Sequence, residues 1–379
     1  MGSYVYLSKI GEGTFSEVFR VRAVTNGRFL ALKRLKCAFK SLTAVYSSRE
    51  IKALKSFSGH PNIIQLLDIL YESSTCRLSL VFELMHETVY DFIKDRVTFV
   101  PLDLVRRWVL QLLLALEFMH NMGVFHRDIK PENLMVTGEA LKVTDLGSCQ
   151  SLRSNQPHTD YISTRWYRAP ECLLTNGYYS YEMDIWATGC VMYEIMTLKP
   201  LFPGDSEIDQ IDLIHQTFGT PQSSLIKEIF ASRCSSELQA QLRPHVGTGL
   251  RSRFSPGTDR SPSNDLLSQL LQYDYRLRIS ASSAINHRYF ANLRESFQLT
   301  MYVIMLTFVN TNYRAYNRRT LATLTNNKQN ALHCSKNQSL CVQSNWSYRP
   351  PLATSTIQTC RRDEKTQKPL IVFPKLRRI

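Results

Sequence analysis

A glycine-rich stretch near the start of the sequence has the residue types of a phosphate-binding loop. Glycine has no side chain, so a turn that contains glycines lets backbone N–H groups approach phosphate oxygens closely. An ordinary glycine hairpin explains the same pattern, so the stretch alone does not decide its function. Its residues are Gly11, Glu12, Gly13, Thr14, Phe15, Ser16, Glu17 and Val18.

A lysine follows in the next apolar run. Lys33, in Ala31-Leu32-Lys33, places an ammonium inside a predicted strand, where an uncompensated charge is costly. It needs an anionic partner, and Glu50 on the predicted helix that follows can supply the carboxylate. The pair would then hold positive charge over the phosphates of a nucleotide. A lysine and a glutamate that simply lie on the surface are the alternative interpretation.

Three further motifs occur in order along the chain. They are His126-Arg127-Asp128-Ile129-Lys130-Pro131-Glu132-Asn133, Asp145-Leu146-Gly147 and Ala169-Pro170-Glu171. Together with the glycine-rich stretch and the lysine, they resemble the eukaryotic protein kinase family. The resemblance covers residues 4–290 and implies an α+β fold of two lobes. We expect a small β-rich N-lobe over residues 4–85 and a larger α-helical C-lobe over residues 86–290.

The resemblance implies a role for each matching side chain, with ATP as the phosphate donor and Mg²⁺ as the cofactor. Asp128 would accept the proton of a substrate hydroxyl or orient that hydroxyl. Lys130 would neutralise charge on the transferred phosphoryl group. Asn133 and Asp145 would hold Mg²⁺, because hard oxygen ligands suit that ion.

The same resemblance counts Lys33 and Glu50 among the catalytic residues. It also gives three residues structural roles within the helical lobe. Glu171 would form a salt bridge with Arg278, and Asp184 would anchor the backbone of the loop that carries the catalytic aspartate.

For the adenine of ATP, the resemblance implies a pocket between the two lobes. The backbone from Glu83 to Met85 would form the hydrogen-bonding edge of this pocket. Ordinary core packing is the alternative interpretation for the apolar residues. Those expected around the ring are Ile10, Val18, Ala31, Phe82 and Met135.

The segment from Asp145 to Glu171 is the one that usually gates kinase activity, and it contains Thr159-Asp160-Tyr161. This triplet resembles the group of mitogen-activated and cyclin-dependent kinases. Three other strings support the same resemblance: Ser163-Thr164-Arg165-Trp166-Tyr167-Arg168, Leu201-Phe202-Pro203-Gly204 and Phe218-Gly219-Thr220-Pro221.

The resemblance implies control by phosphorylation, which adds about −1.5 to −2 charges per phosphate. An upstream kinase or autophosphorylation would supply these phosphates. The charges would pull the gating segment and the helix that bears Glu50 into place. The arginines expected to face the phosphates are Arg49 and Arg127 for Thr159, and Arg165 and Arg168 for Tyr161.

Substrate choice follows from the same resemblance. Arg168 would help to shape a shallow site that favours proline after the phosphate acceptor. Lys130, two residues after Asp128, points to Ser and Thr acceptors. The expected partners are therefore proteins with Ser/Thr-Pro motifs.

Three residues depart from the family pattern. Ser16 replaces the third glycine of the loop, which we expect to stiffen the turn only slightly. Leu146 replaces the phenylalanine that is usual in the middle of the Asp145-Leu146-Gly147 motif, and we expect it to pack with Leu54, Leu66 and His126. Gln150 stands where related kinases commonly place an arginine that faces the phosphothreonine, so control through that phosphate is less secure than catalysis.

The elements that position these residues follow from hydrophobic periodicity. Strands are predicted within residues 4–18, 28–35, 63–71 and 77–83, and one helix within residues 46–57. Beyond residue 87 the pattern is helical, with helices near residues 104–119, 183–196, 209–218, 264–272 and 280–287. A Pro-, Gly- and Ser-rich stretch over residues 243–263 predicts a long surface loop.

The net charge of +14 is concentrated at the end of the chain. Residues 291–379 contain fourteen Lys or Arg and three Asp or Glu, a net charge of +11. This basic tail lacks sustained periodicity, which predicts disorder. No run of the sequence is long and apolar enough to predict a membrane span. We expect no nucleic-acid partner and a catalytic monomer.

Two other functions compete with a kinase. A pseudokinase scaffold would have lost Lys33, Asp128, Asn133 or Asp145, and all four are present. A basic tail that binds nucleic acid or another anionic partner is the second alternative. By resemblance alone, we expect the protein in the cytoplasm or the nucleus, and the cilium is a third compartment that the resemblance suggests.

Overall fold

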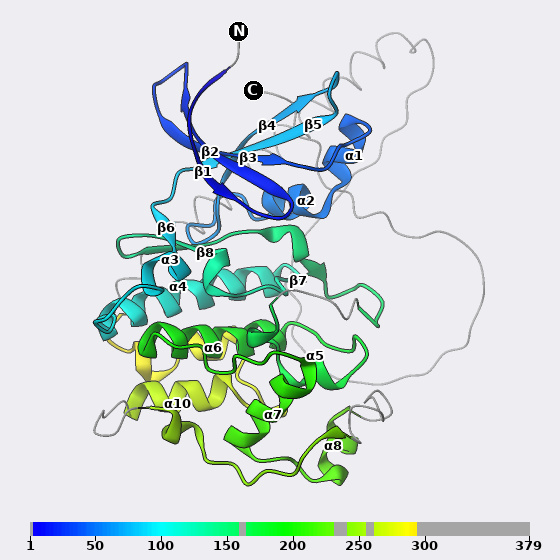
Figure 1. The fold of residues 1–379 in the computed structure, drawn as a ribbon, viewed down its shortest axis with the longest axis vertical. Helices are drawn as coiled ribbons and strands as arrows, with labels where there is room; N and C mark the ends of the chain where they lie inside the picture. Colours follow the sequence, from blue (N-terminus) through cyan, green and yellow to red (C-terminus); the bar gives the residue numbers. More distant parts are fainter. Residues whose placement is uncertain (1–2, 159–163, 231–240, 255–260, 294–379) are drawn as a thin grey trace, which may run out of the picture. The chain divides into compact units, whose positions relative to one another are not determined.

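The first part of the chain folds into five antiparallel strands in the order β1-β2-β3-β5-β4 (Figure 1). The computed structural model describes residues 3–158, 164–230, 241–254 and 261–293, all of which belong to one compact unit. The predicted strands are confirmed, although the first predicted run is two strands joined by a hairpin. The strands are β1 (Tyr4–Glu12), β2 (Ser16–Ala23), β3 (Phe29–Leu35), β4 (Leu66–Glu72) and β5 (Arg77–Glu83).

Alternation along β3 gives the sheet two different faces. Leu30 and Leu32 are buried in a small apolar cluster with Val21 and Val81. Because successive side chains of a strand point to opposite faces, Lys33 lies on the other side of the sheet. The apolar residues around the lysine therefore do not surround its ammonium.

The helix predicted within residues 46–57 is confirmed, and a second short helix that the sequence interpretation missed precedes it. Helix α1 (Leu42–Ser47) ends before Ser48, and helix α2 (Arg49–Ser56) begins after it. Ser48 is extended, and its side chain accepts a hydrogen bond from the N–H of Ile51 at 3.4 Å. A serine in this geometry caps a helix start, so it separates the two helices.

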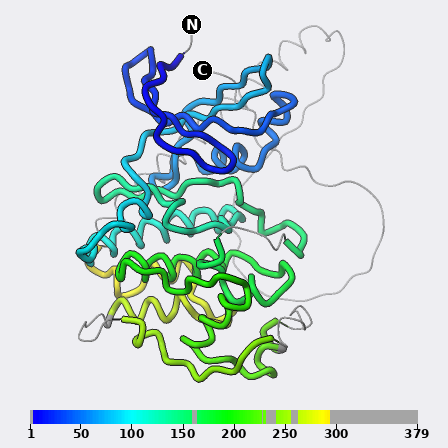
Figure 2. The backbone as a smooth tube through the Cα atoms, in the orientation of Figure 1, coloured from blue at the N-terminus to red at the C-terminus, as the bar shows by residue number. Residues whose placement is uncertain are grey.

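Most of the remaining structure is helical, which confirms the α+β class. Long helices α4 (Leu102–Asn121) and α6 (Glu182–Thr197) pack against each other, and almost every residue of α6 is buried. Figure 2 follows the backbone from the blue strands of the sheet into these helices. The other α-helices among the described residues are α3 (Val89–Ile93), α5 (Pro170–Leu174), α7 (Glu207–Phe218), α8 (Ser223–Phe230), α10 (Ser261–Leu270) and α11 (Ala281–Ile285). Short 3₁₀ helices are η1 (Pro131–Asn133), η2 (Leu146–Ser148), η3 (Arg165–Tyr167), η5 (Leu250–Arg253) and η6 (Arg288–Phe290).

Two small sheets interrupt the helical lobe, and the sequence interpretation missed both. One has the order β6-β8-β9 and the other pairs β10 with β7. The strands are β6 (Glu87–Thr88), β7 (Val124–Phe125), β8 (Leu134–Thr137), β9 (Ala140–Val143) and β10 (Gln150–Ser151). Strands of two to four residues are too short to show a period, which explains the error. Asp128, Lys130, Asn133 and Asp145 lie in the segments that directly follow β7 and β9.

The expected surface loop over residues 243–263 is only partly correct. The structure places η5 at Leu250–Arg253 and starts α10 at Ser261, and residues 255–260 lie outside the described residues. Most of the basic tail, residues 294–379, also lies outside them. Within the described ranges, no helix is both long and apolar enough to span a membrane.

A buried histidine beside α4 makes stability depend on pH. His60 is 4% exposed, its ring lies 4.8 Å from that of Phe118, and its Nδ1 accepts a hydrogen bond from the N–H of Asn62 at 3.2 Å. Among the described residues, its Nε2 has no hydrogen-bond partner. Burial, assisted by the charge of Lys142, lowers the pKa of His60 from 6.5 to about 4. The neutral ring therefore contributes stability above pH 6.5, and this contribution is lost as the pH falls towards 4.

We expect His60→Gln to reduce this sensitivity to acid. Between pH 7 and pH 4, the free energy of unfolding of the wild type should fall by about 2–4 kcal/mol more than that of the variant. Urea denaturation at several pH values measures both slopes. His86→Gln, at an exposed histidine, is the control. Parallel slopes for wild type and His60→Gln would contradict the assignment.

Candidate active site

The glycine-rich stretch is the hairpin between β1 and β2. The N–H of Gly13 donates to the carbonyl of Ser16 at 2.8 Å, which closes the turn. Ser16 begins β2 and pairs with Leu35 on β3, so the departure from glycine falls on ordinary extended backbone. The hairpin is therefore formed without a third glycine.

Charged side chains brace this hairpin from outside. Glu12 forms ion pairs with Lys9 at 2.6 Å and Lys36 at 2.8 Å, and Glu17 contacts Lys9 at 2.8 Å. Hydrogen bonds from these lysines lower the pKa of Glu12 to about 2. The two glutamates of the predicted phosphate loop are thus occupied by the protein's own lysines.

Lys33 contacts two carboxylates, one in its own lobe and one in the helical lobe. Its Nζ lies 2.7 Å from Oε1 of Glu50 on α2 and 3.3 Å from Oδ1 of Asp145, which precedes η2. Burial acts to lower the pKa of Lys33, but the two carboxylates outweigh it and the pKa is raised. Burial likewise acts to raise the pKa of Asp145, but the charges of Lys33 and His126 outweigh it and the pKa is lowered. Lys33 and Asp145 are therefore both charged near neutral pH.

The loop between β7 and η1 brings three more candidate residues together. The Nδ2 of Asn133 donates to both the backbone carbonyl and Oδ2 of Asp128 at 2.8 Å. The Nζ of Lys130 lies 3.2 Å from the same Oδ2. The other oxygen, Oδ1, is buried and has no hydrogen-bond partner among the described residues. One carboxylate oxygen is thus held by the loop, and the second can serve a molecule that binds there.

Asp184 on α6 fixes the backbone of this loop, as the resemblance implies. Its carboxylate accepts hydrogen bonds from the N–H of His126 at 2.8 Å and the N–H of Arg127 at 2.9 Å. Arg127 has a φ of 71°, a left-handed conformation that costs a non-glycine residue roughly 1–2 kcal/mol. The two hydrogen bonds offset this cost. His120, which sequence reasoning missed, contacts the same carboxylate at 2.9 Å.

Leu146 is accommodated in the core. It is fully buried, as is His126, and Leu54 is nearly so. Leu66 packs against the same apolar core, and helix α2 packs against η2, which begins with Leu146. The replacement of phenylalanine therefore leaves no exposed apolar surface at this position.

The residues predicted around adenine lie where the sheet meets the helical lobe. Val18 pairs with Lys33, and Ala31 lies two residues before it on the same face of the sheet. The side chain of Glu83 faces elsewhere, because it accepts a hydrogen bond from Gln65 at 3.0 Å and forms an ion pair with Lys142 at 2.8 Å. Only the backbone of Glu83 can therefore form the hydrogen-bonding edge expected for adenine. Phe82 and Met85 are buried, Val18, Ala31 and Met135 are half-buried, and Ile10 is exposed.

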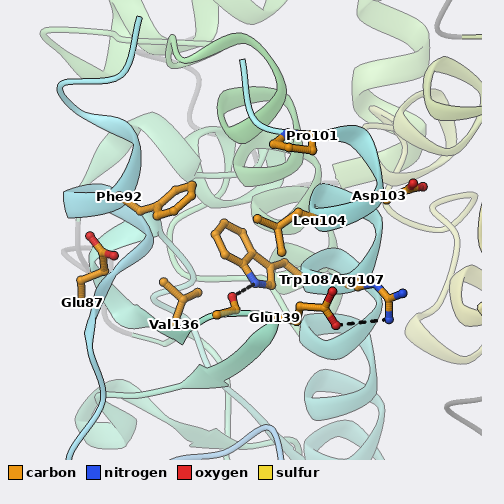
Figure 3. A pocket seen from close by; sticks show the side chains of 10 residues that line it. Glu87, Phe92, Pro101, Asp103, Leu104, Arg107, Trp108, Val136 and Glu139 are labelled. Carbon is orange, nitrogen blue, oxygen red and sulfur yellow. Dashed lines mark hydrogen bonds and ion pairs between the residues drawn. The ribbon is translucent and has the colours of Figure 1, made fainter. Parts of the chain in front are cut away.

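A separate hollow of about 540 Å³ lies beside α3, α4 and the turn from β8 to β9 (Figure 3). Its floor includes Trp108, whose Nε1 donates to the carbonyl of Gly138 at 3.3 Å. At the rim, Arg107 lies 3.5 Å from Glu139. None of the residues predicted to bind ATP or metal lines this hollow. It is therefore distinct from the candidate active site.

The predicted phosphate acceptors, Thr159 and Tyr161, lie outside the described residues. Arg127 donates through Nε to the carbonyl of Ser148 at 2.8 Å and through Nη1 to the hydroxyl of Tyr179 at 3.2 Å. The side chain of Arg127 thus connects η2 to the segment just before α6.

The other three predicted regulatory arginines also have partners. Arg49 donates to Oε1 of Gln150 at 3.4 Å. Arg168 donates to Oε1 of Glu207 at 2.9 Å, and Arg165 donates to the carbonyl of Asp205 at 3.1 Å. Arg165 and Arg168 therefore both contact the start of α7 or the residues just before it.

The salt bridge expected between Glu171 and Arg278 is present deep in the helical lobe. Arg278 donates to both carboxylate oxygens, at 2.6 Å and 2.9 Å. It also donates to the carbonyls of Gln272 and Glu182, and it lies 5.2 Å from the ring centre of Trp186. The two side chains are thus buried together, with each carboxylate oxygen of Glu171 accepting a hydrogen bond from Arg278.

Comparison with known proteins shows which family this chain is similar to. The family model described as "Protein kinase domain" matches residues 4–290. Human "MAPK/MAK/MRK overlapping kinase" is 41% identical over 297 residues, which cover 78% of this chain and 70% of the relative. Mouse "Serine/threonine-protein kinase ICK" is 40% identical over 291 residues, covering 76% and 45% of the two chains. Human "Serine/threonine-protein kinase MAK" is 38% identical over 291 residues, covering 76% and 46%.

Several short strings of the sequence predict the similarity to the MAPK/MAK/MRK overlapping kinase. They are residues 10–18, 145–149 and 161–174. The match to the human and mouse overlapping kinases, at 41% and 43% identity, confirms that prediction.

Proposed function

The chain belongs to the protein kinase family and is a protein serine/threonine kinase, and from this premise we propose that it transfers the γ-phosphoryl group of ATP to Ser or Thr residues that precede proline. We further propose that phosphorylation of Thr159 and Tyr161 controls this activity. The observation that carries the proposal is Oδ1 of Asp128, which has no hydrogen-bond partner among the described residues while Oδ2 is held by Asn133 and Lys130. Catalysis needs such an oxygen in place before the substrate arrives.

Asp128 receives the substrate hydroxyl through Oδ1. Its Oδ2 is held by Asn133 and Lys130, so the carboxylate cannot rotate away without breaking those contacts. As the hydroxyl oxygen bonds to the γ-phosphorus, the bond from that phosphorus to the β,γ-bridging oxygen of ATP breaks and ADP leaves. The hydroxyl proton moves to Asp128. Lys130 supplies a positive charge beside the transferred phosphoryl group.

Lys33 holds the phosphates of ATP from the opposite lobe. Glu50 and Asp145 keep its ammonium charged and oriented across the junction of the lobes. The backbone of the β1–β2 hairpin, closed by Gly13 and Ser16, covers the phosphates from above. The adenine would contact the backbone of residues 83–85 and the apolar side chains of Val18, Ala31 and Met135.

The residues present fit Mg²⁺. No group of three or more His, Cys, Asp or Glu side chains suited to a metal occurs within the described ranges, but Mg²⁺ in a kinase needs fewer protein ligands. The Nδ2 of Asn133 is committed to Asp128, which leaves its Oδ1 for a cation. Asp145 is charged, and its side chain is 47% exposed. Asn133 and Asp145 would hold Mg²⁺, which would supply positive charge to neutralise the phosphates.

Arg168 supports the preference for proline. It is 5% exposed and anchored to Glu207 at 2.9 Å, so it forms part of a fixed surface beside η3. The guanidinium of Arg168 can donate but cannot accept hydrogen bonds. Proline, which has no backbone N–H to donate, therefore suits a substrate position beside it.

Paired peptides test this preference. Two Ser peptides that differ only in Pro or Ala after the acceptor are assayed with the full chain phosphorylated on Thr159 and Tyr161. We expect kcat/KM to be about tenfold or more higher for the Pro peptide, which corresponds to about 1.4 kcal/mol. Equal kcat/KM values for the two peptides would contradict the proposed preference for proline without contradicting the kinase activity.

A second test concerns control by phosphorylation. The double variant Thr159→Ala, Tyr161→Phe should show a lower kcat than the phosphorylated wild type. An unchanged kcat would contradict the proposed control.

A further inference from the structure

Helix α2 begins with a cation, Arg49, at the end of the helix that favours anions. Arg49 is the first residue of α2 and is exposed, and the start of a helix carries a partial positive charge. A cation there is unfavourable unless an acceptor faces it. Glu50, the next residue, holds Lys33 at 2.7 Å, so movement of this helix end would change the catalytic ion pair.

Gln150 supplies an acceptor for Arg49. Its Oε1 receives the hydrogen bond from Arg49 at 3.4 Å, across a sequence separation of 101 residues. Gln150 is itself fixed, because β10 pairs with β7 and brings Gln150 opposite Phe125. Phe125 directly precedes His126, so the contact connects α2 to the backbone that leads into the catalytic loop.

We propose that Gln150 is a positioning residue that keeps α2 docked, and Glu50 against Lys33, without requiring a phosphate at Thr159. The inference rests on the proposed kinase function and concerns its regulation. Gln150 offers Arg49 a neutral carbonyl oxygen. An arginine at this position would instead place a second guanidinium beside the first, and the two would need an anion between them.

Three substitutions at one position separate this role from simple packing. Gln150→Ala removes the acceptor. Gln150→Glu keeps an acceptor and adds a charge that suits Arg49 and the helix start. Gln150→Arg replaces the acceptor with a like charge. Arg153→Ala, at an exposed arginine in the same segment, is the matched control.

Hydrogen–deuterium exchange of the full, dephosphorylated chain reads the docking of α2 directly. In peptides that cover residues 49–56, we expect exchange about three- to tenfold faster in Gln150→Ala and Gln150→Arg than in wild type. Gln150→Glu and Arg153→Ala should exchange as wild type does. Wild-type exchange rates in Gln150→Ala would overturn the inference, and a general increase across the chain would also overturn it as a loss of folding.

The kinase assay reads the consequence in a Thr159→Ala background, which carries no phosphate at that position. Gln150→Arg should lower kcat about tenfold there, with KM for the peptide unchanged, and Gln150→Glu should keep kcat. In the chain phosphorylated on Thr159, the same Gln150→Arg change should lower kcat only slightly. An equal loss with and without the phosphate would overturn the inference. If wild type itself transfers no phosphate while the exchange results hold, the proposed function fails and the docking role of Gln150 stands.

Discussion

Asp128→Ala is expected to lower kcat by about 10²–10⁴, the range for removing a positioned general base. The KM for ATP should change little, because the residues proposed to bind the nucleotide lie elsewhere in the site. The structure gives the reason for the size of the effect. Oδ2 of Asp128 is held by Asn133 and Lys130, and Oδ1 is left without a partner among the described residues.

Steady-state kinetics with a Ser-Pro peptide measures this loss. Asp91→Ala is the matched control, because Asp91 is an exposed carboxylate on α3 that forms an ion pair with Lys94 at 2.8 Å. The control should keep kcat within about twofold, as expected for a surface pair. A kcat for Asp128→Ala within tenfold of wild type would show that this carboxylate does not accept the proton.

Arg278→Ala is expected to have the largest effect on stability, a loss of about 3–5 kcal/mol in the free energy of unfolding. The side chains of Arg278 and Glu171 are 0% and 2% exposed, and removing the arginine leaves a buried carboxylate without its cation. Arg278 also donates to the carbonyls of Gln272 and Glu182, which would lose their donor. A buried pair is costly to break even where it adds little net stability.

Urea denaturation of the full chain measures this loss. The control lies two residues away in the sequence: Arg276 is exposed and forms ion pairs with Asp274 at 2.7 Å and Glu228 at 3.2 Å. Arg276→Ala should leave the denaturation midpoint close to that of wild type. If the two variants were destabilised equally, burial would not be the cause of the effect at Arg278.

The sequence predicts the site best where chemistry depends on short spacing. Asp128, Lys130 and Asn133 lie within six residues of one another, and the structure brings them together through 2.8 Å and 3.2 Å contacts. Lys33 and Glu50 could also be predicted as a pair, because a charged side chain in an apolar strand requires a counter-charge. These inferences need no knowledge of the tertiary fold.

The features that the sequence does not reveal depend on contacts across long separations or on very short elements. His120 and Asp184 are 64 residues apart, and nothing in their spacing indicates that they meet. The contact of Arg49 with Gln150 spans 101 residues, and it rests on a two-residue strand with no detectable period. The separation of α1 from the predicted helix at Ser48 depends on a cap, which competes with helical periodicity in this segment.

Gln150 departs from the family pattern, which commonly has an arginine at this position. The structure shows that Arg49 donates a hydrogen bond to Gln150. A missing arginine on its own indicates weakened control by phosphothreonine. The hydrogen bond from Arg49 indicates instead that the helix has a different support at the same place.

Phosphate transfer from Mg-ATP to a Ser/Thr-Pro peptide by wild type and Asp145→Asn tests the central claim most directly. Asp145 contacts Lys33 and is the proposed carboxylate ligand of Mg²⁺, and asparagine keeps its size while removing its charge. The kinase proposal predicts transfer by wild type that falls by at least about 10² in the variant. Wild-type protein, phosphorylated on Thr159 and Tyr161, that transfers no more phosphate than Asp145→Asn would contradict it.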